Sequence, residues 1–135
     1  MIVLSGALGL SAVPGGITLL AGFYAPPVEQ LEGSVFRDFT VPGLSLLLVV
    51  GGSAVLATVL LARRSRFAWL GSAFSGLAVM SFEFVEVLAI GSPPGPARVM
   101  QALYFGVGLG LVSASLAAML IDLLEPPLAP TRPAP

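Results

Sequence analysis

The sequence predicts an all-α polytopic membrane protein, a four-transmembrane-helix bundle with a short interfacial segment on its outer face. Of the 135 residues, 56% are hydrophobic. Only 10% are charged, whereas soluble globular domains carry roughly 25% charged residues. Four charge-poor stretches are each long enough to cross about 30 Å of hydrocarbon. They occupy most of the chain, so a single transmembrane domain over residues 1–125 is expected.

The first span is predicted over residues 2–23. No charged residue occurs from Met1 to Val28. A signal peptide is the alternative, but the stretch lacks a basic start and exceeds the usual apolar length of roughly 7 to 15 residues, so a retained helix is favoured. Pro14, followed by two glycines, lies near mid-span and predicts a kink.

The second span is predicted over residues 42–62, because Pro42 suits the first turn of a helix. Three arginines follow it: Arg63, Arg64 and Arg66. Before it, the connection from Tyr24 to Val41 has apolar residues at roughly helical spacing, which predicts a short interfacial helix. These apolar residues are Val28, Leu31, Val35, Phe36 and Phe39.

The third and fourth spans are predicted over residues 67–90 and 99–124. Between them, residues 91–98 hold three prolines, which indicate a turn. The tail 126–135 holds five prolines and is expected to be disordered.

Arginine placement predicts the orientation, because short cytoplasmic loops are rich in Arg and Lys. Three of the six arginines lie between the second and third spans. We therefore expect a multi-pass protein of the inner (cytoplasmic) membrane with both termini in the cytoplasm. Arg37 and Arg98 would then lie on the outer face.

Composition excludes several kinds of chemistry. The net charge is −1, and the chain contains neither lysine nor histidine, so no basic surface for nucleic acid is expected. Without cysteine there is no thiol nucleophile, disulfide or thiolate ligand, and without histidine the commonest transition-metal ligand is missing. No metal site and no cofactor are expected, and the lipid bilayer is the expected surrounding.

Glu83 and Glu86 form the candidate site, because ionised acids inside a membrane are costly and often functional. They share a helical stripe whose members follow steps of three and four: Ser72, Gly76, Val79, Glu83, Glu86 and Ile90. One interpretation is a ligand- or proton-binding pocket formed by Glu83, Glu86, Gln101, Tyr104 and Arg37. The alternative is structural: the acids pair with Arg37 or Arg98, or bond to Tyr104, Gln101 and Ser81, and fix the packing.

Small residues predict helix contacts. Gly76 lies on the glutamate stripe, and Gly106, Gly110 and Ala114 follow one another at steps of four on the fourth span. A second small face on that span contains Gly108. The fourth span could therefore contact neighbours on two sides, one of them in another protein.

Three stretches resemble a known family: residues 36–44 (FRDFTVPGL), 49–53 (VVGGS) and 101–106 (QALYFG). They look like small four-helix bacterial membrane proteins, DoxX-like in plan. The resemblance implies the four-helix layout and a bacterial membrane, and it adds no catalytic residue, because such proteins have no settled activity. Glu83 and Glu86 also resemble the intramembrane acids of emopamil-binding-type isomerases, whose expected histidines this chain lacks.

The leading hypothesis is a non-enzymatic protein that acts by helix packing, as an accessory subunit of a larger membrane complex or as a self-associating bundle. The small-residue faces and the scarcity of reactive side chains favour it. The alternative is an outward-facing ligand- or proton-binding or transport protein that uses the glutamate pair. An emopamil-binding-like membrane isomerase is the third hypothesis.

Overall fold

Four long helices form the molecule, as the fold class predicted. The computed structural model describes residues 1–23 and 27–124, and the regular structure of these residues is entirely helical. The four spans are α1 (Ile2–Leu20), the joined segments α2 (Thr40–Leu44), η2 (Ser45–Gly51) and α3 (Gly52–Ala62), then α4 (Ala68–Ile90) and α5 (Pro96–Leu124). Each is long and apolar enough to cross a bilayer, so the chain is a multi-pass membrane protein. The predicted disordered tail lies outside the described residues.

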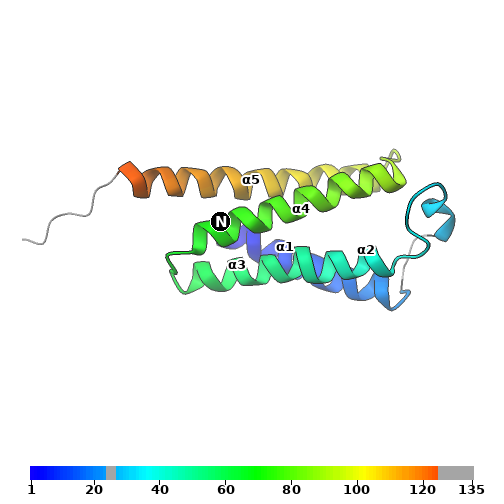
Figure 1. Ribbon diagram of the computed structural model, residues 1–135, viewed down its shortest axis with the longest axis horizontal. Helices are drawn as coiled ribbons and strands as arrows, with labels where there is room; N and C mark the ends of the chain where they lie inside the picture. Colours follow the sequence, from blue (N-terminus) through cyan, green and yellow to red (C-terminus); the bar gives the residue numbers. More distant parts are fainter. Residues whose placement is uncertain (24–26, 125–135) are drawn as a thin grey trace, which may run out of the picture.

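The helices pack in chain-neighbour pairs (Figure 1). α1 lies against the second span, and α4 against α5 and against α3. α5 rests mainly on α4 and touches α1 less extensively. We call the end of the bundle that holds Leu20, Thr40, Ile90 and Pro96 the loop end, and the end that holds Ala62 and Ala68 the arginine end.

α4 and α5 meet backbone to backbone at two glycines. A Cβ atom added to Gly76 would lie 2.6 Å from the Gly108 carbonyl oxygen, and one added to Gly108 would lie 2.7 Å from the Gly76 carbonyl oxygen. Both distances are shorter than any non-bonded carbon–oxygen contact allows, so only glycine fits at either position. Small residues thus bring these membrane helices together.

A similar contact joins α1 to the second span. A Cβ atom on Gly16 would lie 2.7 Å from the Leu47 Cβ atom and 2.9 Å from the Gly43 carbonyl oxygen. Leu47 belongs to η2, a π-helical segment of seven residues, and such segments are often found at functional sites. Pro14 lies inside α1, which continues past it as one helix.

Three span boundaries differ from the predicted ones by two or three residues, and the third span begins one residue later than predicted, at Ala68. α1 ends at Leu20 rather than at residue 23, because Gly22 has φ +73°, a left-handed conformation that ends a helix. The fourth span begins at Pro96 rather than at residue 99, since proline needs no N–H partner in a first turn. The second begins at Thr40, two residues earlier than expected.

The interfacial segment is shorter than predicted. From residue 27 on, where the structure describes it, the segment contains one 3-10 helix, η1 (Val28–Leu31), followed by turns and bends. Leu31 is buried at 5% exposure, whereas Val35 is 90% exposed, so the apolar side chains do not share one helical face.

At the entry to α2, the Asp38 carboxylate accepts a hydrogen bond from the Thr40 backbone N–H at 2.9 Å. This hydrogen bond lowers the pKa of Asp38.

Candidate functional site

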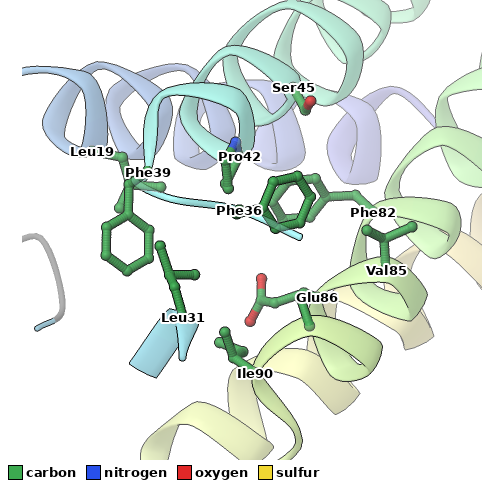
Figure 2. A pocket seen from close by; sticks show the side chains of 11 residues that line it. Leu19, Leu31, Phe36, Phe39, Pro42, Ser45, Phe82, Val85, Glu86 and Ile90 are labelled. Atoms are coloured by element: carbon green, nitrogen blue, oxygen red, sulfur yellow. The ribbon is translucent and has the colours of Figure 1, made fainter. Parts of the chain in front are cut away.

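A cavity of about 150 Å³ lies at the loop end, between α1, η1, α2 and α4. Apolar side chains form nearly all of its wall. The interfacial segment contributes Leu31, Phe36 and Phe39, and α4 contributes Phe82 and Ile90. Glu86 is the one acidic residue among the described residues of the lining, and Figure 2 shows its carboxyl group pointing into the cavity.

Gln101 of α5 forms a hydrogen bond with the Glu86 carboxylate. Its Nε2 donates to Glu86 Oε1 at 3.1 Å and to the Gly91 carbonyl oxygen at 3.2 Å. Gln101 is itself 6% exposed, so its amide is fixed by two acceptors in a buried position. The Glu86 Oε2 atom has no described hydrogen bond and remains available to a ligand in the cavity.

Glu83 lines a different hollow. This second hollow, of about 430 Å³, lies between α4 and α5 and is more open than the Glu86 cavity. Glu83 is 5% exposed, and its Oε2 atom has no hydrogen-bond partner. Residues three apart on a helix diverge by about 60° around its axis, so two acids of one stripe can face different hollows.

The other predicted site residues are dispersed. Tyr104 is half-buried and packs against the apolar core. Arg37 is exposed and lines a surface hollow with Glu29 and Glu32, which contains neither Glu83 nor Glu86.

Arg98 reaches back to the loop between α4 and α5, because its Nε and Nη2 both donate to the Ser92 carbonyl oxygen. Within residues 1–23 and 27–124, the structure shows no ion pair between an arginine and Glu83 or Glu86. The structure therefore brings Gln101 to Glu86, and does not bring Arg37 there.

The packing residues divide into two kinds. Gly76 lies in the α4–α5 contact, together with Gly108. A Cβ atom on Gly106 would meet nothing within 4 Å, one on Gly110 would meet only Leu4 at 3.6 Å, and Ala114 is half-buried. The face of α5 that contains Gly106 is thus largely free within this molecule.

Sequence reasoning missed the aromatic residues of the cavity wall. Phe82 lies four residues before Glu86, a helical neighbour spacing that could have identified it. Phe36 and Phe39 reach the cavity only through the fold of the interfacial segment, for which the local sequence gives no signal. Two buried serines, Ser5 and Ser75, were also missed, whereas the sequence places Ser72 on the glutamate stripe. All three are fully buried, and their hydroxyl groups have no hydrogen-bond partner.

The residues of the Glu86 cavity limit the kinds of ligand that it can hold. Among the described residues, no group of three potential ligands could hold a metal ion. An apolar cavity with a single oriented carboxylate and three aromatic rings in its wall suits a cationic ligand with an apolar body.

The DoxX-like resemblance stays a prediction, and no family model, curated protein or solved structure matches the chain.

Proposed function

We propose that this membrane protein binds a lipophilic cation of the quaternary ammonium type in the Glu86 cavity. The observation that carries the proposal is the Glu86 carboxyl group, which points into a cavity walled by Phe36, Phe39 and Phe82. This is a more specific form of the ligand-binding hypothesis, in which the side chains of the cavity wall determine the class of ligand.

The chemistry of the wall favours a permanent cation. An ionised carboxylate in apolar surroundings is costly unless an opposite charge neutralises it. Gln101 donates to one oxygen of Glu86 and leaves the other free, so a ligand charge can complete the neutralisation. Aromatic faces attract alkylated ammonium groups, which cannot donate hydrogen bonds and so need none from the wall.

Dodecyltrimethylammonium, below its micelle concentration, is a suitable probe. Titrated calorimetrically into the full chain in nanodiscs, it is expected to saturate one site per chain. Dodecyl sulfate, with the same apolar tail and the opposite charge, is the control and should show no saturable site. Equal binding of both surfactants, or partition without saturation, would contradict the proposal.

We further propose that the arginine end faces the cytoplasm of a bacterial cell, so that the cavity opens towards the outside of the inner membrane. The run Arg63, Arg64 and Arg66 supports this orientation, which places both termini in the cytoplasm. The chain has no native cysteine, so single cysteines can report the topology. In intact cells, an impermeant maleimide should label Val35→Cys and spare Ser65→Cys. Reversed labelling would show the opposite orientation.

Helix packing with another protein is the second candidate function, as accessory subunit or self-associating bundle. The free α5 face at Gly106 favours it, because glycine at an unoccupied helix face leaves room for a second helix. Gly106→Leu is expected to abolish association measured by mass photometry in nanodiscs. Gly52→Leu is the matched control, since Gly52 also meets nothing within 4 Å. If the unmodified protein is monomeric and no partner co-purifies with it, the helix-packing function is eliminated.

A further inference from the structure

A groove of about 410 Å³ lies between the second span and α4. Its wall is apolar except for two serines. η2 contributes Ser45, Val49 and Val50, and α4 contributes Phe74, Leu77, Ala78, Ser81, Phe82 and Val85. Val50 is fully buried, whereas Phe74 and Leu77 are exposed. The groove is therefore open along a surface that faces the lipid chains of the bilayer.

The groove forms because α4 and the second span diverge towards the loop end (Figure 1). Nearer the arginine end the two are close: a Cβ atom on Gly71 would lie 2.9 Å from Leu60 Cδ1 and 3.6 Å from Ala57 Cα. Towards the loop end, α4 packs less extensively against η2 than it does against α3. The π-helical segment thus borders the space that the divergence leaves open.

The groove continues into the Glu86 cavity. Three residues, Ser45, Phe82 and Val85, line both hollows. The two are therefore neighbouring parts of one depression between the second span and α4. A single ligand can place its charged group beside Glu86 and its apolar part in the groove.

The Glu86 cavity is too small to hold a whole amphiphile. A protein cavity of about 150 Å³ accommodates a molecule the size of benzene, and the Glu86 cavity has this volume. It can take a trimethylammonium group, but a dodecyl chain must leave it. The groove provides an apolar path for that chain, because it begins at the residues that the two hollows share.

The length of the groove suits one alkyl chain. Val85 and Phe74 mark its extent on α4 and are eleven residues apart, which corresponds to about 16 Å along the helix axis. An extended chain with carbon–carbon bonds of about 1.5 Å advances about 1.25 Å per carbon. Roughly 13 carbons therefore span the groove.

We propose that the groove holds the alkyl chain of the ligand, so that the protein binds a single-chain amphiphile with a tail of about 12 to 14 carbons. This inference rests on the proposed function, because Glu86 fixes the headgroup. The headgroup then lies at the loop end and the tail extends along α4 into the hydrocarbon region, which is how an amphiphile is oriented in a bilayer. The ligand can enter sideways from the lipid without leaving the membrane.

Photolabelling with two dodecyltrimethylammonium analogues measures where the tail lies. One analogue carries a diazirine on the fourth carbon of the chain and the other on the terminal carbon. In the full chain in nanodiscs, the first should label Phe82 and Val85, and the second should label Phe74 and Leu77. Excess unlabelled dodecyltrimethylammonium should suppress both labels, and dodecyl sulfate should suppress neither. Analogue dissolved in the bilayer labels other exposed positions, such as Leu120 of α5, without competition.

Ser81→Trp tests the groove directly, because Ser81 is an exposed residue of its wall. The large ring should fill the groove and reduce the competed label on Phe74 and Leu77 roughly tenfold. Ser113→Trp is the matched control: Ser113 is an exposed serine of α5 outside the groove wall, and its replacement should leave the labels unchanged. The unfolding midpoint in SDS mixed micelles shows whether each variant folds.

The groove and the headgroup site fail in different ways. If dodecyltrimethylammonium binds saturably and Glu86→Gln weakens that binding, but the terminal-carbon label falls on Leu120 and other lipid-facing positions, the groove is refuted and the Glu86 site stands. An unchanged label in a folded Ser81→Trp protein also refutes the groove. The absence of any saturable binding and of any competed label refutes the proposed function itself.

Discussion

Glu86→Gln is expected to weaken binding of dodecyltrimethylammonium roughly 10- to 100-fold. The substitution removes the negative charge that Glu86 contributes to the cavity wall and preserves the side-chain shape. Gln101 Nε2 can still donate to the remaining side-chain oxygen, so the local structure should persist. The aromatic rings continue to attract the ligand weakly, which is why binding is reduced rather than absent.

Glu29→Gln provides the matched control for that titration. Glu29 is an exposed carboxylate in η1, at the same end of the bundle but outside the cavity wall. Its removal changes the net charge equally, yet the probe affinity should change less than about twofold, because exposed charges are screened by salt. If both variants lose affinity equally, the probe responds to general surface charge and the Glu86 cavity is not its site.

Gly108→Ala is expected to destabilise the bundle by roughly 1 to 3 kcal/mol. The new methyl group would lie 2.6 Å from Met80 Cγ and 2.7 Å from the Gly76 carbonyl oxygen. A flexible Met80 side chain can move away, but the α4 backbone at Gly76 cannot move without separating the two helices. Because α4 is the main support of α5, the whole helix pair should loosen.

Gly106→Ala separates this packing effect from the general helix preference of alanine. Gly106 lies on the same helix, two residues away, and has no neighbour within 4 Å. Alanine is favoured over glycine in helices by up to about 1 kcal/mol, so this control should be neutral or slightly stabilising. The unfolding midpoint in SDS mixed micelles, followed by circular dichroism, should therefore fall for Gly108→Ala and stay equal or rise slightly for Gly106→Ala. Equal midpoints would show that α4 and α5 do not meet at Gly76 and Gly108.

The fold was largely predictable because bilayer thickness fixes the length of each apolar run. The exact ends of the helices depend on backbone conformations, which hydropathy does not report. Residues 21–23 continue the apolar run, yet Gly22 ends α1 by its positive φ. The spacing of apolar residues between the first and second spans predicts a helix, but in the structure Leu31, Phe36 and Phe39 line the Glu86 cavity instead of sharing a helical face. The π-helical segment η2 has no signature in composition.

The candidate site was only partly predictable, because two residues of one helical stripe can face different neighbours. The sequence identified Glu83 and Glu86, and Gln101 as a partner, but suggested one shared pocket. The structure places the two acids at separate hollows, linked by Gln101. Which face of α5 packs against α4 was also undecidable from sequence, since small residues occur on both faces and only the three-dimensional contact at Gly108 distinguishes them.

Nuclear Overhauser contacts between a bound quaternary ammonium and the phenylalanine rings test the central proposal most directly. The chain has eight phenylalanines, so selective ring labelling gives a small, assignable spectrum. In nanodiscs, the trimethylammonium protons should contact Phe36, Phe39 and Phe82, and these contacts should disappear in Glu86→Gln. Contacts confined to rings outside the cavity wall, such as Phe74 of α4, would contradict the proposal.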